Sequence, residues 1–255
     1  CVEKIIHTKL AFLNILKNTP KISGRLNEKK CENVSYLHWL SIFILLIKTI
    51  INKNKELKMK KILHIEASPR KDRSHSINVT KKYIDKIQKN GDVEIKKIDL
   101  WNYDLPEFDG DMLNAKYAVI AGTEATAEQN NAWAKVIDIF NEFQDADHYI
   151  FSVPMWNFSI PYKLKHYIDI VTQPGLSWSY TPEDGYSGLM SGKEATVVYA
   201  SGDGYGEGTG FESYDLQKPY ITLWLTFIGF SKIDSIIADR TLFEPEESEK
   251  RALQD

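Results

Sequence analysis

Three serines gather in one short polar loop that suits the binding of an anion. Ser68, Ser74 and Ser76 lie between an apolar run at 62–65 and a helical pattern that Gly91 closes. Hydroxyl groups at the start of a helix, with the free N–H groups of its first turn, form a ready phosphate site. The alternative is that Ser74 or Ser76 serves only as the helix N-cap, which would explain one serine but not the group.

A second loop, residues 153–161, offers suitable walls for a flat heteroaromatic ring. It follows an apolar run that predicts a strand, and it precedes a helical pattern in which Pro161 is expected at the first position. Ligands bind beyond the carboxyl ends of strands in open parallel sheets. The alternative is an ordinary strand-to-helix turn whose aromatic rings fill the core. The centre of this loop consists of Pro154, Met155, Trp156, Asn157 and Phe158.

A third loop, residues 201–208, is rich in glycine and follows a predicted strand. Glycine lets backbone amides approach the pyrimidine edge of a ring with no side chain in between. The alternative is a mobile surface loop. A dinucleotide site of the Rossmann type is disfavoured, because these glycines do not follow the first strand of the fold. A phosphate at the first loop and a planar ring between the other two together describe one ligand, FMN.

The elements that must position these loops alternate between strand and helix. This alternation predicts an α/β fold with a doubly wound, five-stranded parallel sheet and helices on both faces. Strands are expected at 62–65, 93–98, 149–153, 195–200 and 233–238. Helices are expected from 77 to the cap at 91, and at 129–145, 162–172 and 214–228. Residues 112–126 are polar and Ala-rich with few apolar anchors, and 178–185 form a short extended excursion with a turn.

Charge and composition exclude several classes of protein. The chain has 255 residues and a formal net charge of −3, but its first 58 residues carry eleven basic and four acidic side chains. The remainder is acidic and therefore unsuited to nucleic acid, whose phosphates need a basic face. Both cysteines lie before residue 59, and the six histidines form no ligand-like pair. A disulfide framework, a thiol nucleophile and a zinc site are therefore not expected in the main body, nor is a membrane anchor.

The first 58 residues differ from the rest. They are rich in Lys, Asn and Ile, and their apolar run at 40–47 is shorter than a membrane span needs. An interfacial helix is an alternative interpretation. Met59-Lys60-Lys61 immediately precedes the first strand, as many bacterial reading frames begin. We therefore expect 1–58 to be a non-native or disordered extension and 59–255 to be the functional domain. The charged helix expected from 244 stops abruptly, which suggests a truncated C-terminus.

The three loops together resemble the FMN-dependent NADH-azoreductases, flavodoxin-like NAD(P)H:quinone oxidoreductases, over residues 59–246. The resemblance implies a flavodoxin-like fold, with the serines holding the FMN phosphate and ribityl tail. It implies that Met155, Trp156, Asn157 and Phe158 line the isoalloxazine. It also implies that the loop at the flavin carbonyl and N1 edge consists of Ser201, Gly202, Asp203 and Gly204.

Two departures from the family pattern are visible. Trp156 stands where a tyrosine is common, which keeps a flat aromatic ring. Gly202-Asp203-Gly204 stands where Arg-Gly-Gly is common, which changes the charge at the rim of the site and bears on coenzyme preference and substrate range. The resemblance also implies a homodimer, with dimer surface at 178–180 and on the helix expected at 214–228. The alternative for most of those aromatics is core packing.

The function implied is a cytoplasmic oxidoreductase that passes reducing equivalents from NADH through FMN to quinones or azo compounds, in a ping-pong sequence without a protein nucleophile. Asn157 is expected to make a polar contact near the reactive edge of the ring, and His64 and His166 are expected to be structural. An alternative of a different class is a flavodoxin-like electron carrier that does not oxidise NADH itself. A flavin-free interaction module is the third interpretation.

Overall fold

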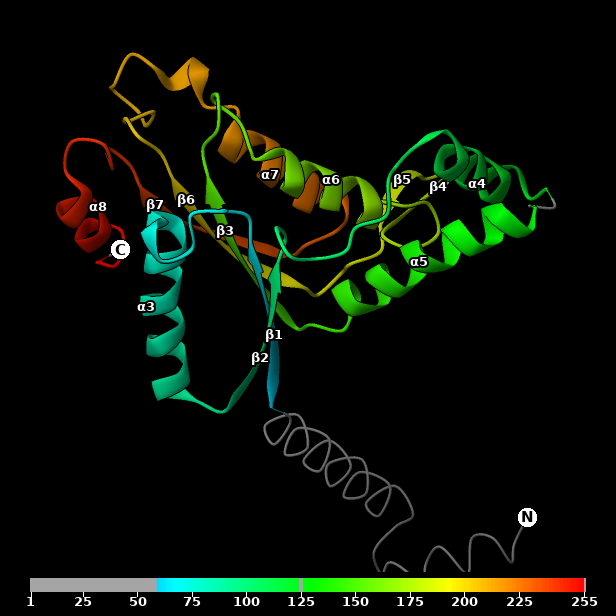
Figure 1. Ribbon diagram of the computed structural model, residues 1–255, viewed down its shortest axis with the longest axis horizontal. Helices are drawn as coiled ribbons and strands as arrows, with labels where there is room; N and C mark the ends of the chain where they lie inside the picture. The colour runs from blue at the N-terminus through cyan, green and yellow to red at the C-terminus, as the bar shows by residue number, and fades with distance from the viewer. Residues whose placement is uncertain (1–58, 124–125, 255) are drawn as a thin grey trace, which may run out of the picture. The chain divides into compact units, whose positions relative to one another are not determined.

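The computed structural model describes residues 59–123 and 126–254. The expectation for residues 1–58 lies outside the described residues. The described part is built on one parallel sheet of five strands in the order β2-β1-β3-β6-β7 (Figure 1). Its strands are β1 Lys60–Glu66, β2 Val93–Asp99, β3 His148–Pro154, β6 Glu194–Ala200 and β7 Lys232–Ala238. The predicted doubly wound, five-stranded parallel sheet is confirmed.

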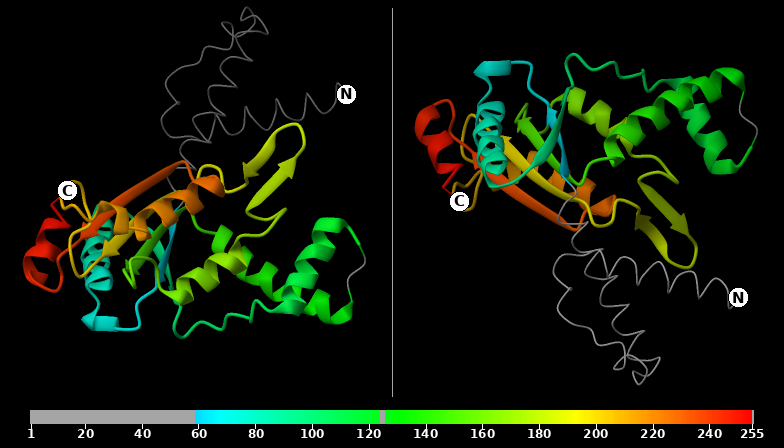
Figure 2. Two further views of the ribbon diagram at one scale, coloured as in Figure 1. Left: turned by 90° about the horizontal axis from the view of Figure 1, so that it is seen from above. Right: turned by 90° about the horizontal axis from the view of Figure 1, so that it is seen from below.

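Helices cover both faces of this sheet (Figures 1 and 2). On one face lie α3 His75–Asn90 and α8 Pro245–Arg251, which pack with Val198 and Ala238 in a small apolar cluster. The other face carries the main core. The helices that pack there are α5 Ala127–Gln144, α6 Tyr162–Val171 and α7 Gln217–Phe227. Successive side chains of a strand point to opposite faces. Because β3 is buried along nearly its whole length, it contributes side chains to the packing on both faces of the sheet.

Two helix starts differ from the sequence expectation. Pro161 is the N-cap of α6 rather than its first residue, since the helix begins at Tyr162. Helix α7 begins at Gln217 rather than at Tyr214, because residues 212–214 form a separate 3-10 turn, η3 Glu212–Tyr214. The Asp215 carboxylate accepts hydrogen bonds from the N–H groups of Gln217 and Lys218, at 2.9 and 3.0 Å. These bonds satisfy N–H groups that have no partner within the helix.

The polar stretch after residue 109 forms a helix, α4 Gly110–Ala121, which lies against α5 (Figure 1). Its ends are defined by local chemistry. The Asp109 carboxylate accepts from the N–H groups of Asp111 and Met112, both at 3.1 Å, and Gly122 ends the helix with a φ of 63°. A carboxylate cap and a left-handed glycine are strong helix boundaries. The apolar pattern of the sequence did not predict this helix, because only two of its residues, Met112 and Ala115, are buried.

The excursion after α6 is an antiparallel hairpin of β4 Trp178–Thr181 and β5 Gly185–Gly188. It docks on the end of α7, where the rings of Trp178 and Tyr186 each lie 5.9 Å from that of Phe227. The backbones touch at this point, since a Cβ on Gly188 would lie 2.3 Å from the Gly229 nitrogen. The hairpin can pack here only because Gly188 has no side chain.

We expect Gly188→Ala to destabilise the fold by roughly 1–3 kcal/mol, because two backbone segments must separate to admit the methyl group. Urea denaturation measures this change. Gly110→Ala is the matched control, because a Cβ there meets nothing within 4 Å. An equal loss of stability in both variants would contradict the close-approach explanation.

None of the helices in residues 59–123 and 126–254 is long and apolar enough to cross a membrane.

Candidate functional site

The serine loop runs from the end of β1 to the first turn of α3 and buries all three hydroxyl-bearing residues. Ser68, Ser74 and Ser76 are at most 2% exposed. Ser74 occupies the N-cap position of α3, but its side chain makes no capping hydrogen bond. Its Oγ lies instead 3.1 Å from Oγ of Ser76. The hydroxyls therefore form a pair at the helix N-terminus, where first-turn N–H groups have no partner within the helix.

The same loop carries cations. Lys71, in a left-handed conformation with φ 51°, pairs with Asp99 at the end of β2. Burial raises the pKa of Asp99, but hydrogen bonds from Lys71, the Trp101 N–H and Asn102 outweigh it, so the net shift is downward. Arg70 and Arg73 are exposed and form no ion pair with any residue that the structure describes. Free guanidinium groups beside a helix N-terminus favour a phosphate ligand.

The loop after β3 is a tight turn in a strained backbone. Trp156 and Ser159 exchange two backbone hydrogen bonds, of 2.9 and 3.0 Å. Asn157 and Phe158 between them have φ values of 46° and 70°. Two successive positive φ values belong to the type I′ turn, which asparagine tolerates and phenylalanine rarely adopts. Strain of this kind gathers at ligand sites, and here it holds both side chains in exposed positions.

The left-handed backbone at Phe158 predicts that the more hydrophobic of two replacements gives the less stable protein. Phe158→Val and Phe158→Asn both remove the ring, but a β-branched residue fits a φ of 70° poorly and asparagine fits it well. We expect the valine variant to be less stable than the asparagine variant by about 1 kcal/mol, as measured by thermal unfolding. A more stable valine variant would contradict the left-handed backbone.

The glycine-rich loop after β6 folds on itself and on the segment after β7. Oγ of Ser201 donates to the Asp203 carbonyl at 2.6 Å, and the Asp203 carboxylate accepts the Gly204 N–H at 2.8 Å. A Cβ on Gly202 would lie 2.8 Å from Leu242. The Gly204 N–H therefore already has a partner, the Asp203 carboxylate. The group that packs closely against Gly202 in this structure is the Leu242 side chain.

The sheet brings the three loops to one edge. In the order β2-β1-β3-β6-β7 the chain moves outward in opposite directions from β1 and β3, so these strands flank the switch point where such folds bind ligands. The Met155 N–H donates to the Ala200 carbonyl at 2.7 Å, and the Phe158 ring lies 6.2 Å from that of Tyr205. The second and third loops are therefore in direct contact.

A cavity of about 630 Å³ lies on the β6 side of this edge. Two of the residues predicted for the site, Met155 and Ser201, line it together with Tyr205 and Gln217. The Gln217 amide nitrogen donates to the Val153 carbonyl at 3.0 Å and so ties the start of α7 to β3. The remaining predicted residues lie on the three loops without lining this cavity.

Comparison with known proteins identifies the architecture. Residues 60–255 match the family described as having a flavodoxin-like fold. The chain belongs to this flavodoxin-like family. An FMN-dependent NADH:quinone oxidoreductase of Desulfotalea psychrophila is 47% identical over 193 residues, which cover 75% of this chain and 91% of that protein. An FMN-dependent NADH:quinone oxidoreductase of Burkholderia lata is 43% identical, over 72% and 90% of the two chains.

Solved structures of the flavodoxin-like family agree. An FMN-dependent NADH-azoreductase of Bacillus anthracis, in complex with FMN, superposes with a TM-score of 0.69 at 28% identity, over 77% of this chain and 95% of that one. A second azoreductase structure from Bacillus anthracis gives a TM-score of 0.68 at 26% identity, with coverage of 77% and 94%. The resemblance to the FMN-dependent NADH-azoreductases, drawn from the three loops, is confirmed.

Sequence reasoning missed two residues that border the flavodoxin-like site. The indole N–H of Trp101 donates to the Ala67 carbonyl at 2.9 Å, and its ring lies 5.7 Å from that of Trp156. Trp101 lies two residues after the end of the second strand, so its place at the same sheet edge was a usable signal. Arg240, with φ 56°, brings its Nε to within 3.2 Å of where a Gly204 Cβ would stand. It comes from the loop after β7, and no local pattern pointed to it.

Proposed function

We propose that the chain is an FMN-dependent oxidoreductase that oxidises NADH and reduces quinones or azo compounds. The observation that carries this proposal is the convergence of the three loops at the β1/β3 switch point of a flavodoxin-like sheet. Relatives at 47% and 43% identity are named FMN-dependent NADH:quinone oxidoreductases, and azoreductases share the fold.

The residues of this chain fit the cofactor. The paired hydroxyls of Ser74 and Ser76, buried at the N-terminus of α3, offer the donor set that a phosphate monoester needs. Ser68, whose Oγ accepts the Arg70 N–H at 3.3 Å, stands two residues after the end of β1 and suits the ribityl chain. The residues proposed to hold the ring and its edge are Pro154, Met155, Trp156, Asn157, Phe158, Ser201, Gly202, Asp203 and Gly204.

When bound, FMN would carry the electrons from NADH to the acceptor. The role of the chain's own residues is to bind the flavin and to orient the reactants against it. The turn at Asn157 and Phe158 presents an amide and an aromatic ring on a backbone that the Trp156–Ser159 bonds hold in place. Trp156 and Trp101, whose tilted rings lie 5.7 Å apart, would form one wall beside the bound ring. Rigid, preformed walls of this kind orient a planar reactant and exclude water from it.

The alternative is an electron carrier that binds FMN and leaves NADH oxidation to a partner. The names of the relatives favour the enzyme over the carrier. Anaerobic spectroscopy separates the two. The purified chain is loaded with FMN, given NADH, and then given a quinone or an azo dye. Bleaching of the flavin bands, reversed by the acceptor, supports the enzyme. A yellow protein that NADH does not bleach supports the carrier, and a colourless protein refutes the site.

We infer further that the enzyme is a cytoplasmic homodimer. Exposed apolar side chains lie on the hairpin and on α7, where Tyr180, Tyr186 and Leu223 are 58%, 67% and 69% exposed. The rings of Tyr180 and Tyr186 lie 5.0 Å apart, and exposed apolar surface of this kind marks interaction sites. Of the aromatics on α7, Trp224 belongs to the core instead, since it is 5% exposed. A monomer in sedimentation equilibrium at micromolar concentration would contradict the dimer.

A further inference from the structure

The interface between α3 and the sheet contains several buried polar side chains beside its small apolar cluster, whereas the opposite face carries the main apolar core. The side chains that the central strands turn toward α3 include His64, Ser152 and Thr196, all at most 3% exposed. Buried polar groups lower stability unless each finds a hydrogen-bond partner. An interface built from such groups specifies one arrangement of the helix on the sheet more narrowly than methyl groups would.

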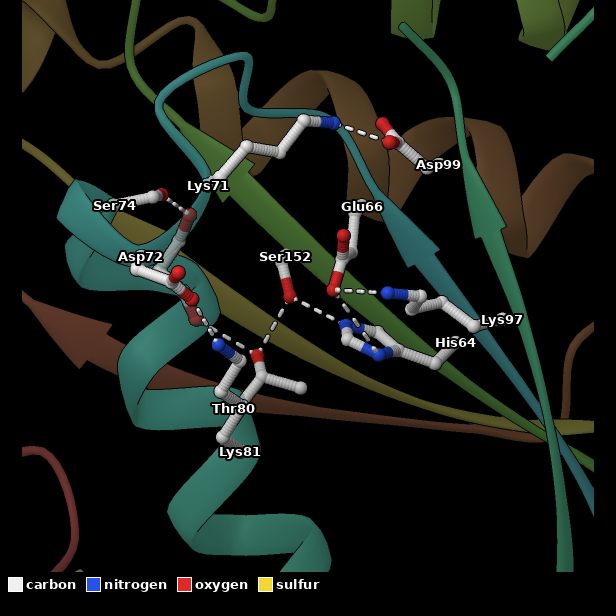
Figure 3. A network of polar contacts seen from close by, with 11 residues as sticks. His64, Glu66, Lys71, Asp72, Ser74, Thr80, Lys81, Lys97, Asp99 and Ser152 are labelled. Carbon is white, nitrogen blue, oxygen red and sulfur yellow. Dashed lines mark hydrogen bonds and ion pairs between the residues drawn. The ribbon is translucent and has the colours of Figure 1, made fainter. Parts of the chain in front are cut away.

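His64 and Ser152 form, with Thr80 of α3, an unbroken chain of hydrogen bonds that ends on the serine loop (Figure 3). The His64 Nε2 lies 2.8 Å from Oγ of Ser152, which donates to Oγ1 of Thr80 at 2.8 Å. Thr80 in turn donates to the backbone carbonyl of Ser76 at 2.8 Å. We refer to His64, Ser152 and Thr80 as the relay. It connects β1 and β3 to the first turn of α3.

The direction of the relay follows from proton counting. Each hydroxyl has one proton to donate. Thr80 donates its proton to the Ser76 carbonyl and Ser152 donates its proton to Thr80. Oγ of Ser152 must therefore accept from His64, which requires a proton on the histidine Nε2. All three donors point the same way, toward Ser76, and bonds aligned head to tail strengthen one another.

The surroundings of His64 keep the imidazole neutral. Burial, with the charges of Lys97 and Lys81, lowers its pKa to about 4. Glu66 faces the other ring nitrogen, with 4.0 Å between Nδ1 and Oε1, and Lys97 lies 3.8 Å from the same carboxylate oxygen (Figure 3). At neutral pH the ring has a single N–H, and the relay assigns it to Nε2.

We propose that His64 is a positioning residue for the phosphate end of the cofactor site, acting through Ser152 and Thr80 on the first turn of α3. This inference rests on the proposed function. The bond to the Ser76 carbonyl orients the peptide plane of the turn from which the Ser74 and Ser76 hydroxyls extend. Helix ends fray when they are held only by the helix itself. The Thr80 hydroxyl belongs to α3, but Ser152 of β3 holds it in place, so the sheet anchors this turn before the ligand arrives.

A second chain of hydrogen bonds, which joins β3 and β6 to the same helix, provides the matched control. The His148 Nε2 lies 3.0 Å from Oγ1 of Thr196, which lies 3.2 Å from the Tyr83 hydroxyl. It resembles the relay in chemistry, but it is only part-buried where it ends on Tyr83, about two turns beyond Ser76. It therefore holds the middle of α3 to the sheet and makes no bond to the phosphate-binding turn.

The test compares affinities for FMN and for riboflavin, which lacks the phosphate. We expect His64→Leu and Thr80→Val each to weaken FMN binding about 5- to 10-fold, the effect of one lost buried hydrogen bond, with riboflavin affinity unchanged. The double variant should lose no more than either single variant, because both break the same chain. His64→Gln, which keeps a donor, should recover part of the loss. Tyr83→Phe should leave both affinities unchanged.

Hydrogen exchange gives a readout that does not depend on the flavin. The amides of Asn78 and Val79, which follow the first turn of α3 and donate back to its carbonyls, should exchange faster in Thr80→Val than in the wild type, whereas in Tyr83→Phe they should not. Equal losses for FMN and riboflavin, or faster exchange along all of α3, would reduce the relay to a general structural role and overturn the proposal. A wild-type chain that binds neither flavin would instead refute the proposed function.

Discussion

Replacing Ser74 by aspartate is expected to weaken FMN binding by about 1000-fold or more while the apoprotein keeps its stability. Ser74 occupies the N-cap of α3 without using its side chain as a cap. Aspartate is among the best N-cap residues, so the helix should tolerate or gain from the change. A carboxylate within about 4 Å of a phosphate, however, repels it by several kcal/mol in a partly buried site. Flavin fluorescence titration measures the affinity, and thermal unfolding measures the stability.

The matched control places the same charge at the other end of the same helix. Gln88→Glu adds one negative charge in the exposed last turn of α3. It should change FMN affinity less than 3-fold, because ionic strength screens an exposed charge beyond about 10 Å. Ser74→Ala, which removes the hydroxyl without adding charge, should cost roughly 10-fold. Unchanged FMN binding by Ser74→Asp would remove the serine loop from the phosphate site.

Phe143→Ala is expected to destabilise the protein by about 3–5 kcal/mol, as large-to-small changes of buried aromatics do. Phe143 is fully buried at the end of α5, where β3, α6 and α7 meet around it. Five aromatic rings have centroids within 6.5 Å of its own, namely those of Phe140, Tyr149, Tyr167, Trp224 and Phe230. Rigid rings around a deleted ring cannot collapse into the cavity, so the loss should be near the upper end.

Calorimetry tests this expectation, since each kcal/mol lowers the midpoint of a domain of this size by roughly 2–4 °C. Phe143→Leu keeps most of the volume and should lose clearly less. Phe243→Ala removes the same side chain from a position that is 69% exposed and should change the free energy of unfolding by less than about 0.5 kcal/mol. Similar effects at positions 143 and 243 would mean that the aromatic cluster is not the centre of the core.

The loops of the candidate site could be proposed from the sequence because each is contiguous. Ser68, Ser74 and Ser76 lie within nine residues, and the turn around Asn157 lies within five. A strand before each loop and a helical pattern after the first two are local signals that periodicity and punctuation residues reveal. Once alternation predicts a parallel sheet, the carboxyl ends of its strands must share one edge, which places the three loops together.

Other features needed the folded structure. Helix α4 was underestimated because its apolar pattern is weak, although Asp109 and Gly122 marked its ends. The need for glycine at position 188 arises from the Gly229 backbone, forty-one residues later in the chain. Arg240 reaches Gly204 across two strand ends. Contacts at such separations depend on how elements dock, and no local pattern encodes them.

The sequence by itself determined the fold class, the positions of all five strands along the chain and the three loops proposed to form the cofactor site. Only the tertiary structure decided which side chains act on those loops. The register that pairs Glu66 of β1 with Ser152 of β3 brings His64 within reach of Ser152, and the docking of α3 adds Thr80. Strand and helix propensities are local, whereas hydrogen bonds join whatever groups packing brings within about 3 Å.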